Sequence, residues 1–210
     1  MANNARENIL RKIKQALENP VPVPFPASEG PQQLFHSPQE DIAIEFAENF
    51  RKLQGRFSFC PHEKELAEQL KLLTDSRGWK KLYCREPLLK AMLATAGLTA
   101  SYTDDLSGCD AAITGCETLV ARTGSMVLSS AQPGGRTTSV YAPVHICIAY
   151  TRQLVHDISE SLVQLKEKYE RQLPSLITLA TGPSRTADIE KTLVVGVHGP
   201  KEVFCFLIDG

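Results

Sequence analysis

The chain has 210 residues, of which 42% are hydrophobic and 22% are charged, and its formal net charge is −1. This length fits one compact domain with an additional arm, and the near-neutral charge excludes a long-range attraction to nucleic acid or anionic lipid. No apolar run approaches the roughly 18 residues that a membrane-spanning helix needs, and residues 1–19 lack the apolar core of a secretory signal. We therefore expect a soluble, cytoplasmic protein with no membrane span and no nucleic-acid partner.

Residues 1–38 are predicted to form a separate N-terminal element ahead of a domain over residues 39–210. From Asn4 to Leu17, apolar residues recur at helical spacing, which predicts an amphipathic helix of about four turns. The following NPVPVPFPASEGP is rich in proline, which fixes φ and removes amide donors, so it is expected to be extended. This element either docks on the domain or on a partner, or is a leader without a binding role.

The domain is predicted to alternate helices with short strands. Asp41 and Asp157 each precede a helical pattern as N-caps, and Pro61 and Pro87 each open a further helix. Runs of strand length are found at 79–84, 111–114, 125–128, 144–150, 175–180 and 202–208. Several of these runs are apolar throughout, which indicates an α/β fold with a mostly parallel sheet and helices on both faces.

The cysteines and histidines are not spaced as metal ligands. The six cysteines form no CxxC or CxxCxxC motif, and the five histidines form no HxxxH or HExxH motif. Cys84, Cys147 and Cys205 lie in apolar runs, where a thiol behaves as a small hydrophobic group. We expect six free, structural cysteines in a reducing compartment, no metal and no cofactor, with His145 as a core histidine.

The strongest candidate for ligand binding is the loop over residues 181–200, because it follows a predicted strand and ligands of open α/β sheets bind beyond strand carboxyl ends. Arg185 offers a fork for carboxylate or phosphate, and a short helix is predicted to begin near Ala187. Helix N-terminal amides together with an arginine can hold an anion. The alternative is a capped helix whose Arg185 pairs with Asp188 or another surface carboxylate. The predicted binding residues of this loop are Gly182, Ser184, Arg185 and Thr186.

A second, weaker candidate is the turn formed by Thr123, Gly124 and Ser125, with Arg136 opposite as a further anion clamp. Small residues let a ligand approach the backbone, although such residues are also typical of ordinary turns.

Three ionisable residues are candidates for catalysis. His198 lies between glycines and is expected to be exposed enough to act as an acid or base, or else to cap a strand. Asp188 and Glu190 are two residues apart on the predicted helix, so they point apart and cannot form a close pair. The absence of GxSxG, P-loop and GxGxxG motifs leaves nucleophilic hydrolysis and common nucleotide sites without support.

The motif TGPSRTADIE at 181–190, followed by GVHGP at 196–200, resembles the C-terminal signature of the LUD (lactate utilisation) family, in its short protein C type. Ile113–Gly115, the turn at 123–125, Arg136 and Pro143–Ile146 match as well. The resemblance covers roughly residues 40–208, and a fifteen-residue signature in order is highly specific. In the matched family an acidic residue usually precedes the Thr-Gly turn, where this chain has Arg122, and threonine is usual at Ser125.

The resemblance implies a fold like that of glucosamine-6-phosphate deaminase, ribose-5-phosphate isomerase, CoA transferases and formyltetrahydrofolate cyclo-ligase. It also implies a role beside iron–sulfur partner proteins in bacterial oxidation of L-lactate to pyruvate. Because the chain carries no cluster motif, we expect a non-redox component that binds a small carboxylate or phosphate. The alternatives are a stand-alone enzyme acting on a phosphosugar or acyl-CoA ester, and a scaffold without catalysis.

Overall fold

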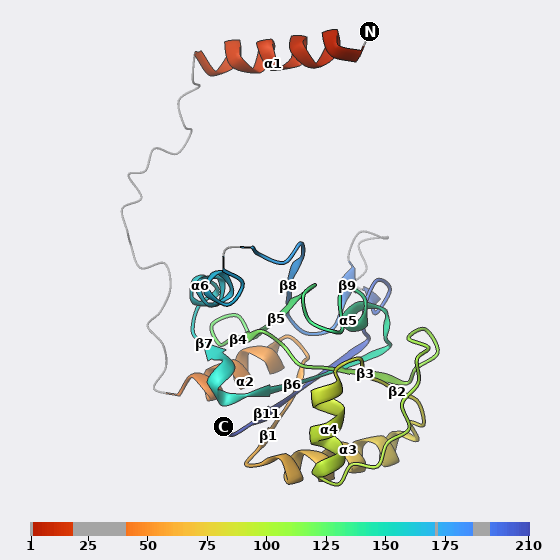
Figure 1. Ribbon diagram of the computed structural model, residues 1–210. Coiled ribbons are helices and arrows are strands. Elements are labelled where there is room, and N and C mark those ends of the chain that lie inside the picture. Colours follow the sequence, from red (N-terminus) through yellow and green to blue (C-terminus); the bar gives the residue numbers. More distant parts are fainter. Residues whose placement is uncertain (1, 19–40, 171, 187–193) are drawn as a thin grey trace. The chain divides into compact units, whose positions relative to one another are not determined.

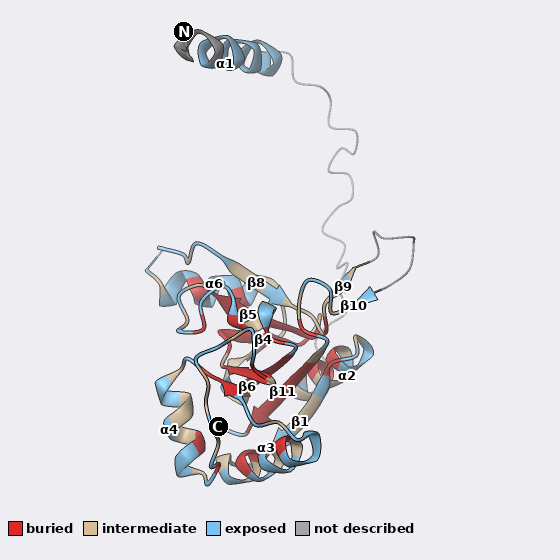
Figure 2. Ribbon diagram, turned by 90° about the vertical axis from the view of Figure 1, so that its right-hand side faces the viewer, coloured by how far each residue is buried: buried red, intermediate tan, exposed pale blue. Residues whose placement is uncertain are grey.

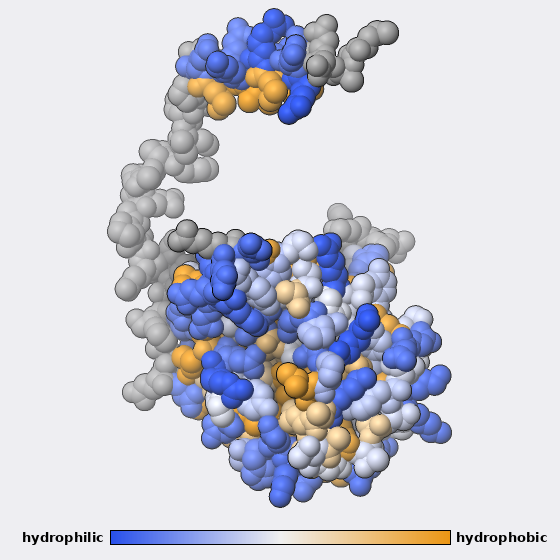
Figure 3. Space-filling model, viewed as in Figure 1, coloured by the Kyte–Doolittle hydropathy of each residue, from blue (hydrophilic) through white to orange (hydrophobic). Residues whose placement is uncertain are grey.

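The computed structural model describes residues 2–18, 41–170, 172–186 and 194–210. The chain divides into two units, Met1–Ser37 and Pro38–Gly210. In the first unit, helix α1 spans Ala2–Glu18 (Figure 1). Its apolar side chains gather on one face (Figure 3) and are 50–72% exposed at Ile9, Leu10, Ile13 and Leu17. The predicted amphipathic helix is confirmed, whereas the proline-rich segment lies outside the described residues.

The second unit is built on a central sheet of five parallel strands in the order β1-β11-β6-β3-β2. Their bounds are Arg56–Cys60 for β1, Leu82–Tyr83 for β2, Ala111–Thr114 for β3, Val144–Tyr150 for β6 and Glu202–Ile208 for β11. The middle strands are buried along almost their whole length (Figure 2). Because all five strands run the same way, their carboxyl ends meet at one edge of the sheet.

Helices α3 (Glu63–Arg77) and α4 (Pro87–Thr95) cover one face of this sheet (Figure 1). Pro61 does not lie in the first turn of α3, because the next residue, His62, is the N-cap. The Nδ1 of His62 accepts a hydrogen bond from the Glu65 amide. The buried residues of this layer include Leu66, Leu70, Leu93, Ile146, Ile148 and Phe206.

The opposite face is covered by helix α2 (Ile42–Lys52) and by a second sheet. This sheet has the order β7-β4-β5-β8, and helix α6 (Ile158–Lys168) packs on its outer side. The strands are Thr118–Val120 for β4, Ser125–Ser129 for β5, Leu154–Val155 for β7 and Ile177–Ala180 for β8. The predicted α/β fold with a mostly parallel sheet flanked by helices is therefore confirmed, and the second sheet is an addition to it.

The remaining elements are short. They are α5 (Thr138–Tyr141), the 3-10 turn η1 (Thr151–Gln153), and the antiparallel pair β9 (Arg185–Thr186) and β10 (Val194–Val195). The helix predicted to begin near Ala187 falls on residues 187–193, outside the described part, and the residues on either side are strands. Among the described residues, no helix is long and apolar enough to cross a membrane.

Two features of the core bear on chemistry. All six cysteines are buried and none forms a disulfide. The neighbouring Cys147 thiol and burial together hold the pKa of Cys116 well above its ordinary value. His145 is 1% exposed, and its Nε2 lies 2.8 Å from the Thr114 hydroxyl. Burial lowers the pKa of His145 to about 4, so it is neutral at physiological pH, as expected of a core histidine.

Candidate functional site

A pocket of about 690 Å³ opens at the carboxyl ends of β2, β3 and β6. The residues that follow these strands line it: Glu86 after β2, 115–117 after β3, and Tyr150, Arg152 and Gln153 at the end of β6. The last turn of α6 completes the wall with Lys168 and Tyr169. Ligands of open α/β sheets bind at this edge, and the volume is typical of small-molecule pockets, which measure roughly 300–1,000 Å³.

Glu86 is held at the pocket wall by the backbone of the neighbouring strand end. Its Oε1 accepts a hydrogen bond of 2.9 Å from the Gly115 amide. A Cβ at Gly115 would lie 3.1 Å from Oε2 of Glu86, so glycine leaves room for the carboxyl group. Burial raises the pKa of Glu86, the Gly115 amide opposes this, and the nearby Glu117 carboxylate raises the pKa further. No described residue donates a hydrogen bond to Oε2, which leaves one oxygen available to a ligand.

Glu117 is the more deeply buried carboxylate, with a side chain that is only 2% exposed. It accepts hydrogen bonds of 2.6 Å from Lys168 Nζ, 2.6 Å from the Ser129 hydroxyl and 2.7 Å from the Tyr169 hydroxyl. Burial alone would raise the pKa of Glu117, but these three donors outweigh it and hold the pKa below its ordinary value. Glu117 is therefore ionised and its carboxylate is occupied by these three donors, so it can act on a ligand only through its electric field and through Lys168.

The rim of the pocket carries a second cation and an aromatic ring. The Arg152 guanidinium lies 4.1 Å from the centroid of the Tyr150 ring. The Tyr150 hydroxyl donates to Glu63 at 2.8 Å, and burial together with this carboxylate raises the pKa of Tyr150 to about 12. Arg152 is exposed, and an arginine in this position can bind a carboxylate or phosphate through two parallel hydrogen bonds.

Two carboxyl groups thus face one pocket with pKa values shifted in opposite directions. Such a pair is the usual arrangement of a proton-transferring group beside a permanently ionised one. Within the described residues, no group of three or more histidine, cysteine or acidic side chains is placed to hold a metal ion. The arrangement suits binding of an anionic ligand at the rim and proton exchange with Glu86.

The described parts of the loop over 181–200, residues 181–186 and 194–200, lie at the amino ends of the central strands. β8, the strand that precedes it, belongs to the second sheet, and the loop returns to the amino end of β11. Hydrogen bonds fix it there: the Ser184 amide donates to the Pro200 carbonyl at 3.0 Å, and the Lys201 amide to the Pro143 carbonyl at 2.8 Å. The rule that placed this loop at strand carboxyl ends therefore does not apply to it.

The two predicted turns meet at the C-terminal end of α2. A Cβ on Gly182 would lie 2.5 Å from the Leu53 carbonyl oxygen, and one on Gly124 2.5 Å from the Phe50 amide nitrogen. Arg185 donates to the Leu53 carbonyl, where a cation complements the negative end of the helix. In the described structure these residues pack against the C-terminal end of α2. Anion binding by Arg185 stays a prediction.

Hydroxyl groups of the two turns form hydrogen bonds with one another. The Ser125 hydroxyl is buried and lies 2.8 Å from the hydroxyls of both Thr123 and Thr181. Arg122, where an acidic residue was expected from the family resemblance, forms an ion pair of 2.6 Å with Asp157, the N-cap of α6. Arg136 does not join them: its guanidinium donates to the Ser175 hydroxyl at 2.5 Å.

His198 is exposed and lines a hollow of about 470 Å³ at the amino edge of the sheet, together with Ser107, Tyr141 and Lys201. Ser184 packs against Gly199: a Cβ added to Gly199 would lie 2.7 Å from the Cβ of Ser184. Thr186 lies in β9. Asp188 and Glu190 lie outside the described residues. The structure therefore brings none of the described predicted residues to the pocket that holds Glu86 and Glu117.

Sequence reasoning missed this pocket, although a signal was available. Glu86 and Glu117 follow predicted strands closely, and the same rule that was applied to 181–200 could have been applied to each strand end. Lys168 and Tyr169 had no such signal, because only the packing of α6 on the second sheet brings them to Glu117.

The fold and the pocket together define an open α/β protein with a pocket at the carboxyl ends of its parallel strands. The LUD domain model matches residues 90–208, and the chain belongs to this family.

Several curated proteins are similar to this chain. An uncharacterized protein of Neisseria meningitidis serogroup B is 34% identical over 106 residues, which is 50% of this chain and 45% of the relative. Lactate utilization protein C of Geobacillus sp. is 39% identical over 90 residues, 42% of this chain and 37% of the relative. The matched segment thus spans less than half the length of either relative. The uncharacterized protein YkgG of Escherichia coli is 25% identical over 97% of this chain and 98% of its own length.

Among solved structures, a DUF162 family protein from Deinococcus radiodurans is similar, with a TM-score of 0.59 and 19% identity. The match covers 80% of this chain and 96% of that one, and at this identity it supports the fold alone. The predicted likeness to phosphosugar isomerases and CoA transferases stays a prediction.

Proposed function

We propose that this protein acts in lactate utilisation as a component that binds a small carboxylate, such as L-lactate or pyruvate, in the pocket at the carboxyl ends of β2, β3 and β6. The names of several relatives support the pathway. The observation that carries the binding proposal is that Glu86, with one carboxyl oxygen unpaired among the described residues, and the Arg152 guanidinium line the same pocket.

In this proposal each residue has one role. Arg152 binds the ligand carboxylate, and Glu86 exchanges a proton with the ligand hydroxyl, since a raised pKa brings its titration closer to neutral pH. Glu117 keeps the negative field that raises the pKa of Glu86 and holds Lys168 at the pocket wall. Electron transfer belongs to iron–sulfur partner proteins, which residues 1–38 help to recruit.

Ligand binding is tested by calorimetry and thermal unfolding with L-lactate and pyruvate. A ligand at 100 times its Kd should stabilise the folded protein by about 2.7 kcal/mol. Each variant is compared with its own ligand-free state. Arg152→Gln should abolish the stabilisation by the ligand, whereas Arg185→Gln should keep it. Loss of binding in Arg185→Gln alone would move the site to the amino edge, and binding of neither acid by the unmodified protein would refute the proposal.

The recruiting role is tested separately. The protein should co-purify with the iron–sulfur proteins of the lactate system, and deletion of residues 1–38 should remove them while leaving the domain folded and ligand binding intact. A complex that survives the deletion refutes this part. If the complex is lost and no acid binds, the protein is a scaffold.

A second candidate is a stand-alone enzyme acting on a phosphosugar or an acyl-CoA ester. The volume of about 690 Å³ favours it, because a three-carbon acid would fill a small part of such a pocket. Ribose 5-phosphate, glucosamine 6-phosphate and acetyl-CoA therefore form further arms of the same thermal assay. If one of these compounds stabilises the protein while lactate and pyruvate have no effect, the result supports the stand-alone enzyme.

A further inference from the structure

The outer side of the second sheet has an apolar surface that α6 does not cover. α6 packs mainly on β4 and β7, and β8 lies at the sheet edge. Four large apolar side chains of this region are 37–52% exposed: Leu162, Val163, Leu173 and Leu179. Leu179 faces the outer side because it alternates in phase with Ile177, which packs beneath α6. We call these four residues the α6–β8 surface.

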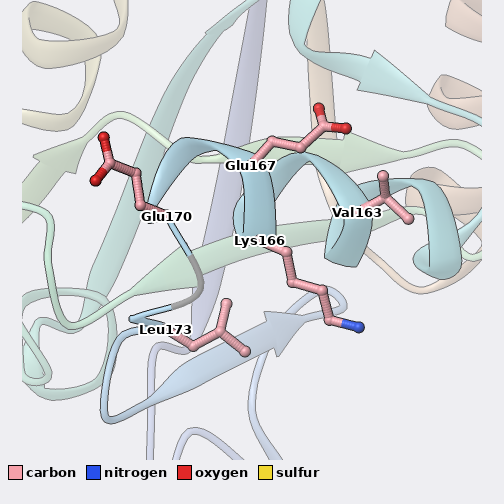
Figure 4. Close-up of a pocket in the computed structure, with 5 residues that line it drawn as sticks. All are labelled: Val163, Lys166, Glu167, Glu170 and Leu173. Carbon is pink, nitrogen blue, oxygen red and sulfur yellow. The ribbon is translucent and has the colours of Figure 1, made fainter.

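The α6–β8 surface contains an open hollow of about 850 Å³. Val163 and Lys166 border it from α6, and Leu173 borders it from the segment that leads to β8 (Figure 4). Glu167 and Glu170, also at its border, point away from Lys166 (Figure 4). The hollow therefore combines apolar walls with charges of both signs.

Among the described strands, β8 forms one edge of the second sheet, beside the α6–β8 surface. Among the described strands, β8 pairs only with β5. An edge strand presents unpaired amides and carbonyls to which another strand can bond. An apolar surface beside an open edge marks a protein interface more than a small-molecule site.

We propose that the α6–β8 surface is the interface of a symmetric dimer of this chain. A two-fold interface places the same surface of both copies in contact, so the surface must complement itself. The surface can complement itself because Lys166 and the two carboxylates of Glu167 and Glu170 surround its apolar centre. In the dimer, Lys166 of each copy faces the Glu167–Glu170 side of the other copy. A stable interface buries about 800 Å² on each partner, so it extends beyond the hollow to β8 and its flanks.

Sedimentation velocity of the full chain tests the proposal. Over a range of micromolar concentrations the protein should sediment as a dimer, with twice the chain mass of 23.1 kDa. Val163→Asp places a charge in the centre of the interface and should give a monomer. Leu72→Asp is the matched control, because Leu72 is 70% exposed on α3 and should leave the dimer intact. A monomer at every concentration overturns the proposal.

Three further variants keep the test specific. Lys166→Glu should weaken dimerisation on the order of tenfold by placing like charges together, and the double variant Lys166→Glu, Glu170→Lys should restore it. Leu17→Asp, on the apolar face of α1, should dimerise normally. Loss of the dimer in Leu17→Asp with a persistent dimer in Val163→Asp overturns the assignment. Circular dichroism shows that each variant is folded.

Discussion

Acidification from pH 7 to pH 5 should cost the folded protein about 2 kcal/mol through His145 alone. This imidazole is buried in β6, and its Nε2 forms a hydrogen bond with the Thr114 hydroxyl. Burial disfavours the charged ring, so the pKa of His145 in the folded protein is about 4, against an ordinary value of 6.5. The unfolded chain therefore binds a proton that the folded protein does not.

The magnitude follows from the two pKa values. A separation of about 2.5 units corresponds to roughly 3 kcal/mol at low pH. At pH 5 the unfolded imidazole is mostly protonated and the folded one mostly neutral, which gives about 2 kcal/mol. The sign is fixed: the unfolded state binds more protons, so stability is lost as pH falls from about 6.5 to about 4, and this contribution is constant below that window.

The assay is urea unfolding at a series of pH values for the unmodified protein and for His145→Gln, which cannot titrate. The free energy of unfolding of the unmodified protein should fall more steeply between pH 7 and pH 5, and the difference between the two profiles should change by about 2 kcal/mol. A constant offset reflects only the altered hydrogen bond to Thr114. Two parallel profiles would show that His145 does not carry a depressed pKa and would refute the reasoning.

Two further predictions concern the glycine turn and the thiols. Gly182→Ala should destabilise the protein by more than Gly135→Ala: both glycines have a positive φ, worth about 1–2 kcal/mol, but only Gly182 lies against backbone, the Leu53 carbonyl. Equal losses of unfolding free energy in urea would contradict the packing role assigned to this turn. The six cysteines should react slowly with Ellman's reagent in the native protein and rapidly in guanidinium, because all are buried and burial raises the pKa of Cys60 to about 11. A fast native reaction of Cys116, which lines the pocket, would contradict this.

Local chemistry in the sequence was sufficient for many elements of the fold. Asp41 and Asp157 cap α2 and α6 as their side chains predict, because capping involves only neighbouring amides. The apolar runs of β6 and β11 are the two longest strands of the parallel sheet. In the same way, His145 within an apolar run indicated a core histidine. The motif at 181–200 identified the family.

The tertiary structure alone decided where each loop lies. Residues 181–186 follow a strand in the chain, yet that strand belongs to the second sheet, so they lie at the amino ends of the central strands, against α2. Glu86 and Glu117 come to one pocket because β2 and β3 are parallel neighbours, and Lys168 reaches Glu117 because α6 packs across β4. Side-chain patterns within a segment record how that segment folds, but strand order and sheet membership depend on contacts between distant segments, which no local pattern records.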